Sequence, residues 1–163
     1  MVKDFKENIM KKMTIYVEDN FGWENRTNML SIVTGISKNE AAKAIGSTPG
    51  SFLGRCRNGK FNLEERRKIA NAFNGKLVMK IICDDGKIFN ADNYDNVKDM
   101  ISDVRDYKKM SWADIAKNCG SYYNAFIQRL DVGKISDETI TEIAEVLGCT
   151  YESYIELENG SVI

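Results

Sequence analysis

Hydrophobic residues recur along this chain at two different spacings. Between residues 23 and 33, and again between residues 97 and 107, apolar side chains follow each other every three or four positions, the spacing of one face of an α-helix. From Tyr151 to Leu157 the spacing changes to the alternation that gives a strand two different faces. The sequence therefore predicts short helices followed by strands, in an α+β fold that is mainly α. The predicted core positions of the two helical stretches are Trp23, Thr27, Leu30, Val33, Val97, Ile101, Val104 and Tyr107.

This pattern occurs twice. A shift of 74 positions aligns residues 36–89 with residues 110–163 without a gap and gives 14 identities in 54 positions. Upstream, the stretch IYVEDNF before the first occurrence resembles IFNADNY before the second. We therefore expect a tandem duplication. Residues 23–89 are called the first half below, and residues 97–163 the second half.

Each half has the signals of four short helices and a β-hairpin. Ser37 and Ser111 are placed to cap the second helix, and a following glycine ends it. The third helix follows within a residue or two, as in a helix-turn-helix. An Asp-Gly or Asn-Gly pair then predicts a type I′ hairpin turn in each half. The other residues predicted to end a helix, cap a helix or form a turn are Gly46, Gly59, Asn62 and Asp85-Gly86 in the first half, and Gly120, Gly133, Ser136 and Asn159-Gly160 in the second.

These signals predict the organisation of the whole chain. Val2, Phe5 and Ile9 fall on one side of a predicted N-terminal helix, which suits a packing or dimer surface. The predicted parts are an N-terminal helix and strand extension (1–22), a basic helix-turn-helix domain (23–89), a linker (90–96) and an acidic helix-turn-helix domain (97–163).

Two stretches, ISDVRDYKKMSWADIAKNCG (101–120) and the one that begins STPGSFLGRCRNGK (47–60), resemble the phage-repressor (XRE/Cro-like) helix-turn-helix family. The resemblance implies transcription regulation by DNA binding. It also implies that the start of the second helix and the first turn of the third helix face DNA. These positions are Lys38, Pro49, Gly50, Ser51 and Gly54 in the first half, and Trp112, Tyr123, Asn124, Ala125 and Gln128 in the second.

Charge distinguishes the two halves. The first half has 12 Lys and Arg against 6 Asp and Glu, whereas the second has 7 against 12, so the formal charges are +6 and −5. Because neutralised phosphates supply most non-specific DNA affinity, the first half is the one suited to double-stranded DNA. An ordinary solvated surface is the alternative interpretation. The candidate DNA-binding residues here are Lys38, Lys43, Thr48, Ser51, Arg55, Arg57 and Lys60.

The second half combines possible base readers with acidic and aromatic residues. Asn124 and Gln128 suit adenine, and Arg129 joins them as a candidate DNA contact. Exposed aromatic side chains surrounded by carboxylates fit a protein interface better than a duplex. The alternative is that Trp112 and one tyrosine pack against the first half or the N-terminal helix. The candidate protein-interface residues are Trp112, Tyr122, Tyr123, Asp114 and Asp131.

Catalytic and metal chemistry finds little support. The chain has no histidine, and its four cysteines have no CxxC spacing, so we expect no zinc site, no cofactor and no enzyme, but buried reduced thiols. The charged N-terminus lacks the apolar segment of a signal peptide, so we expect a cytoplasmic protein without a membrane partner.

Two functions remain. The first is a transcription regulator whose first half contacts DNA, with the second half supplying partner or homodimer contacts. The second is a phage-encoded anti-defence (anti-CRISPR-like) inhibitor that docks on a host nucleic-acid-handling protein through its acidic, aromatic half.

Overall fold

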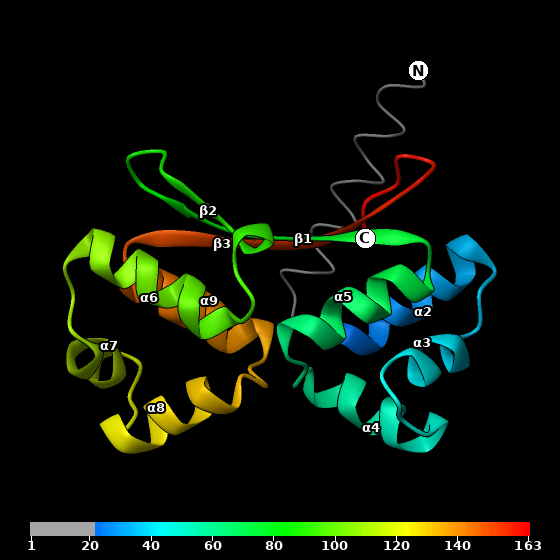
Figure 1. Cartoon of the computed structure of the whole chain (residues 1–163), viewed down its shortest axis with the longest axis horizontal. Coiled ribbons are helices and arrows are strands. Elements are labelled where there is room, and N and C mark those ends of the chain that lie inside the picture. Colours follow the sequence, from blue (N-terminus) through cyan, green and yellow to red (C-terminus); the bar gives the residue numbers. More distant parts are fainter. Residues whose placement is uncertain (1–21) are drawn as a thin grey trace. The chain divides into compact units, whose positions relative to one another are not determined.

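The computed structural model describes residues 22–163. The helix and strand predicted within residues 1–22 fall almost entirely outside the described residues. Within these, the chain forms eight α-helices, a short 3-10 helix and three strands, so the fold is α+β and mainly helical, as predicted (Figure 1).

The chain divides into two compact units, which are described separately. Of the described residues, unit 1 contains 22–59, Glu65–Leu77 and Tyr154–Ile163, and unit 2 contains Lys60–Glu64 and Val78–Ser153. The division passes through one helix and two strands. The linker at 90–96 stays a prediction.

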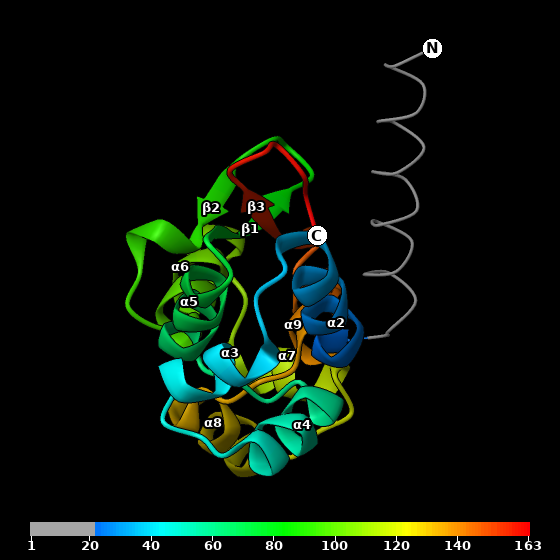
Figure 2. The same ribbon diagram turned by 90° about the vertical axis from the view of Figure 1, so that its right-hand side faces the viewer.

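Unit 1 contains three helices and most of a fourth, whose first two residues belong to unit 2. Their buried residues include Trp23, Leu30 and Phe52, and all three are 3% exposed or less. Figure 2 shows the turn that joins the second and third of these helices. The helices are α2 (Gly22–Thr34), α3 (Lys38–Ala44), α4 (Pro49–Asn58) and α5 (Leu63–Ala72).

The turn between α3 and α4 follows from three residues. Gly46 has a φ of +68°, the left-handed conformation that ends a helix most cheaply in glycine. The N–H of Ser47 then donates to the carbonyl of Ala42 at 2.9 Å. Thr48 caps α4, and Pro49 occupies its first turn, where the missing N–H costs nothing. A tight turn thus joins α3 to α4.

Unit 2 contains the corresponding helices of the second half. The helices α7, α8 and α9 begin and end 74 residues after α3, α4 and α5. The turn between α7 and α8 also repeats the bond described above, because Ser121 N–H donates to Ala116 at 2.9 Å. The elements are β2 (Ile88–Asn90), η1 (Ala91–Asn93), α6 (Val97–Lys108), α7 (Trp112–Asn118), α8 (Tyr123–Val132) and α9 (Asp137–Val146).

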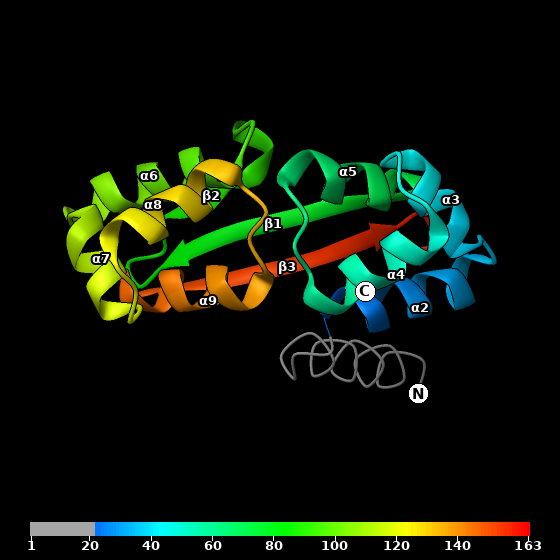
Figure 3. The same cartoon turned by 90° about the horizontal axis from the view of Figure 1, so that it is seen from below.

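The strands form a sheet of order β2-β1-β3, in which β1 spans Gly75–Cys83 and β3 spans Cys149–Leu157. β1 and β2 are antiparallel, with Ile81 opposite Phe89. β1 and β3 also run in opposite directions (Figure 3). Two side-chain contacts indicate how β1 is aligned with β3. Cys83 contacts Cys149. Lys80, three residues before Cys83, contacts Glu152, three residues after Cys149.

The predicted type I′ turn at Asp85-Gly86 is wrong in detail. Cys83 N–H donates to Lys87 O and Gly86 N–H donates to Cys83 O, so three residues form the loop. Only Gly86 has a positive φ there, of +92°. This is the type I turn with a bulge that a three-residue hairpin prefers. A loop of the same kind follows β3, where Gly160 N–H donates to Leu157 O.

Two of the predicted core positions are not buried. Val33, in the last turn of α2, is 41% exposed, and Tyr107 is 43% exposed. The Tyr107 ring instead packs edge-on against Phe89, and its hydroxyl donates to Asp85. The other six predicted positions of these helices are buried.

Candidate nucleic-acid interface

Helix α4 has two different sides. Phe52 and Cys56 face the core, with exposures of 3% and 2%. The opposite side consists mostly of residues with small side chains, so few side-chain atoms project from it into solvent. The exposed residues of its first six positions are Pro49, Gly50, Ser51, Leu53 and Gly54.

The two glycines in α4 have no packing role in the described structure. A Cβ atom placed on Gly50 or Gly54 meets nothing within 4 Å, and neither residue has a positive φ. Glycine inside a helix costs about 0.5–1 kcal/mol relative to alanine. Both glycines therefore reduce the stability of α4 while leaving its outer surface open to close approach by another molecule.

The start of α4 is already partly capped. Thr48 Oγ1 accepts the N–H of Ser51 at 3.2 Å, and Pro49 has no N–H to offer. In the first turn this leaves the N–H of Gly50 for an external acceptor. The start of α4 therefore offers a phosphate only this one backbone N–H of the first turn.

Arg55 is engaged inside unit 1. Its Nη1 lies 2.7 Å from Glu65 Oε2, and the two side chains are only 23% and 15% exposed. The guanidinium thus joins α4 to α5 and has little surface left for a phosphate. The sequence did not reveal this partner, because Glu65 lies on the next helix among other charged residues.

Other cations of the first half lie at the surface. Arg57 is 64% exposed, and its Nε is 3.7 Å from Glu24. Lys43 is 75% exposed and pairs with Glu40 at 3.6 Å. Exposed pairs of this kind contribute about 0–1 kcal/mol, so a phosphate can replace the carboxylate at little cost.

The two remaining predicted lysines differ. Lys60, directly after Gly59, is exposed. Lys38 is half-buried and donates to Asn28 Oδ1 on α2, which holds its ammonium against the neighbouring helix.

Helix α8 carries functional groups where α4 carries glycine. Asn124 and Gln128 are both exposed, and they stand 74 residues after Gly50 and Gly54. Arg129 is exposed too and donates to Ser121 Oγ at 3.1 Å. All three predicted contacts of the second half therefore lie at the surface of one helix.

The aromatic residues of the second half behave differently from one another. Trp112 is half-buried, with the Arg105 guanidinium 5.0 Å from its ring centroid and the Phe126 ring at 6.3 Å. Both contacts lie within the second half itself. Packing against the first half or the N-terminal helix, the alternative interpretation, stays a prediction. Tyr122 is 89% exposed and Tyr123 is 50% exposed, which leaves both available at the start of α8.

The two predicted acidic residues also differ. Asp131 forms an ion pair with Lys98, whereas Asp114 is exposed in the first turn of α7, where its N–H donates to Ser111 Oγ. This bond confirms the predicted cap of α7.

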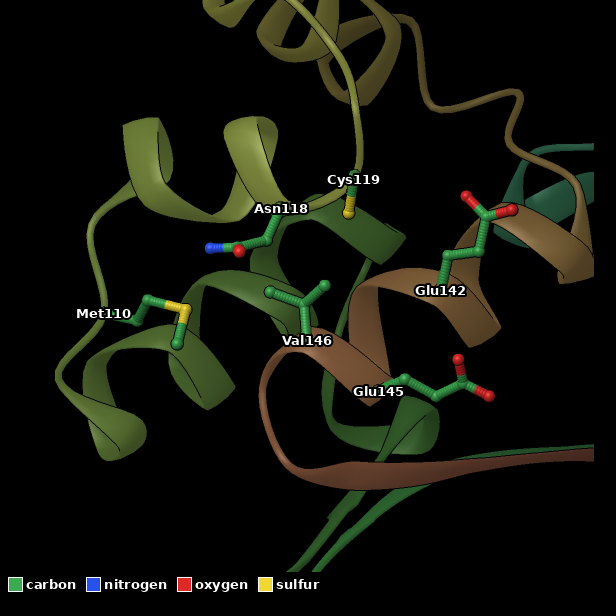
Figure 4. A pocket seen from close by; sticks show the side chains of 6 residues that line it. All are labelled: Met110, Asn118, Cys119, Glu142, Glu145 and Val146. Atoms are coloured by element: carbon green, nitrogen blue, oxygen red, sulfur yellow. The ribbon is translucent and has the colours of Figure 1, made fainter.

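An open hollow of about 690 Å³ lies in unit 2, lined by the end of α7 and by α9 (Figure 4). Cys119 lines it, and burial raises the pKa of this thiol, with Glu142 adding to the shift. No residue pattern in the sequence predicted this hollow. No group of three acidic or cysteine side chains suited to a metal ion occurs in the described part of the chain. The residues that line the hollow are Met110, Asn118, Cys119, Glu142, Glu145 and Val146.

Among residues 22–163, no helix has the length and apolar character needed to cross a bilayer. Comparisons with protein-family models, with curated proteins and with solved structures found no match to this chain.

Proposed function

We propose that this chain is a DNA-binding transcription regulator of the phage-repressor type, in which α4 approaches the duplex closely and contacts mainly its backbone. The observation that carries the proposal is the open side of α4. Gly50 and Gly54 reduce helix stability without serving the described fold, and a close-fitting external surface explains why they are there.

We also propose that the two halves derive from a tandem duplication. Three helices and β1 recur with bounds offset by 74 residues, from Lys38 and Trp112 onward. The strand pairing recurs as well, because Ile82 opposite Ile88 corresponds to Glu156 opposite Val162. Duplication explains why α4 and α8 have similar buried residues and different exposed residues.

Backbone contact rather than base reading is what α4 supports. Glycine has no side chain for a base edge, and the Arg55 guanidinium is occupied by Glu65. Arg57 and Lys43 are exposed and only weakly paired, so they are the cations we assign to phosphates. Sequence preference would then come from groove shape and DNA deformability.

The experiment is a fluorescence-anisotropy titration of a labelled duplex with the full chain over a range of salt concentrations. Binding should weaken steeply as salt rises. Replacing Lys43 and Arg57 by alanine should reduce affinity about tenfold or more and reduce the salt slope by about 1–2. The matched control replaces Lys117 and Arg129, the exposed cations of α7 and α8, and should retain affinity. Equal losses in the two double variants would contradict binding through α4.

The glycines give a second, more specific test. Changing Gly50 and Gly54 together to alanine should raise the free energy of unfolding by about 1–2 kcal/mol. The same change should weaken duplex binding, because two methyl groups then stand between α4 and the DNA. Greater stability with unchanged affinity would disprove close approach.

Tyr122 favours a second candidate, the anti-defence inhibitor that docks on a nucleic-acid-handling protein of the host. An 89% exposed aromatic side chain next to a half-exposed Tyr123 is unusual on a surface without a partner. On the host protein, the acidic second half would compete with nucleic acid for a basic channel. In this case Tyr122→Ala with Tyr123→Ala should abolish co-purification with that protein, and the Lys43/Arg57 variant should not.

A further inference from the structure

Two cysteines that are far apart in the sequence meet in unit 2. Cys83 is the last residue of β1 and Cys149 the first of β3. Their sulfur atoms are 2.9 Å apart, and the residues are 3% and 7% exposed. Both are free thiols, and they contact each other directly inside the fold.

The backbone places the pair where a cross-strand bond fits. Cys83 uses its N–H and its carbonyl on the β2 side, with Lys87 and Gly86. Toward β3 it therefore occupies a non-hydrogen-bonded position, where opposite Cα atoms are about 4.5 Å apart. This separation lies within the range of about 4.4–6.8 Å that disulfides span without backbone movement.

We propose that Cys83 and Cys149 are a modification site that forms a reversible intrachain disulfide by exchange with a small-molecule disulfide of the glutathione class. One protein thiolate attacks the small disulfide and releases one small thiol. The second protein thiolate then attacks the mixed disulfide, forms the Cys83–Cys149 bond and releases the other small thiol. Two electrons pass to the reagent, and the two thiol protons end on the two released molecules.

The surroundings of the pair make this exchange slow. Burial, followed by the hydrogen bond with Cys83, raises the pKa of Cys149 to about 12. The nearby Lys108 ammonium opposes this shift, although it also pairs with Asp84 at 2.9 Å. Because only the thiolate attacks, oxidation should be slow at neutral pH and faster in alkali.

The other two cysteines are placed differently. Cys56 is buried in unit 1, with Thr27 as its neighbour, and Cys119 lines the open hollow of Figure 4. Cys119 is therefore the thiol most open to a simple mixed disulfide.

The disulfide would join residues 66 positions apart and enclose α6, α7, α8 and α9 in one loop. Closing a loop of this length restricts the unfolded chain more than the folded one. We expect the oxidised full chain to melt about 10 °C above the reduced chain.

The test equilibrates the full chain with oxidised glutathione, blocks remaining thiols and digests with trypsin. The sequence predicts a linked product of peptides 81–87 and 135–163, two hydrogens lighter than their sum. A variant with Cys56→Ser and Cys119→Ser keeps only the pair and should give the same product and the same rise in Tm. Cys83→Ser should give neither.

Recovery of Cys83 and Cys149 as blocked thiols, or as separate glutathione adducts, in the folded Cys56/Cys119 variant would overturn the proposal. Because this variant keeps both residues of the pair, the result does not depend on whether Cys83→Ser folds. DNA binding plays no part in either readout.

Discussion

Helices α4 and α8 are alike inside and different outside. Both span ten residues, both end at a glycine in the left-handed conformation, and Phe52 and Phe126 are buried at matching positions. On the exposed side, Gly50 and Gly54 of α4 are aligned in sequence with Asn124 and Gln128 of α8. The comparison shows that one helical framework retains its packing residues while its solvent-facing residues, which decide what can bind, change freely.

An arginine that is identical in the two helices also has different partners in each. Arg55 and Arg129 are paired in the alignment, yet Arg55 bonds to Glu65 and Arg129 to the hydroxyl of Ser121. Thr139 stands where Glu65 would recur. One missing carboxylate on the following helix therefore turns an internal arginine into a surface arginine.

The largest expected effect tests the shared interior. Phe52→Ala and Phe126→Ala should each lower the free energy of unfolding by about 3–5 kcal/mol. The Phe126 ring also packs against the Trp112 ring, with the two centroids 6.3 Å apart. Urea unfolding followed by circular dichroism measures both.

Val132→Ala is the control, since Val132 is 61% exposed and should change stability by less than about 0.5 kcal/mol. A small loss for one phenylalanine and a large loss for the other would show that the two interiors are not equivalent.

A smaller effect should separate the two arginines. Arg55→Ala breaks a mostly buried ion pair and should cost about 1–2 kcal/mol of unfolding free energy. Arg129→Ala removes an exposed side chain and should cost less than about 0.5 kcal/mol. A double-mutant cycle of Arg55 with Glu65 measures the coupling directly, and zero coupling would refute the internal role of Arg55.

The helices were largely predictable from the sequence because their ends depend on local chemistry. Gly46, Ser111 and Pro49 each act on their own backbone or on residues within three positions. The hairpin was also local, but its turn type was not, since Asp-Gly fits both a two-residue and a three-residue loop. Register between strands decides that choice, and no single dipeptide encodes it.

The candidate site was less predictable because exposure depends on distant partners. The alignment identified α4 and its cations, but the burial of Arg55 depends on how α5 packs. Cys83 and Cys149 are 66 residues apart in the sequence, and their contact depends on the register of two strands. Contacts of this kind follow from three-dimensional packing, which residue spacing does not reveal.

The smallest expected effect concerns another difference inside the two helices, where Cys56 of α4 corresponds to Leu130 of α8. Burial raises the pKa of Cys56 from 9.0 to about 11, and the hydrogen bond from Thr27 opposes this only partly. Between these values the unfolded chain loses the thiol proton first, so stability due to this residue is full below pH 9 and is lost toward pH 11. Between pH 8 and pH 10.5 the wild type should therefore lose more unfolding free energy than Cys56→Ala, measured in urea at both pH values. Equal losses would show that Cys56 titrates normally, and that the alkaline response of the chain comes from groups other than this one.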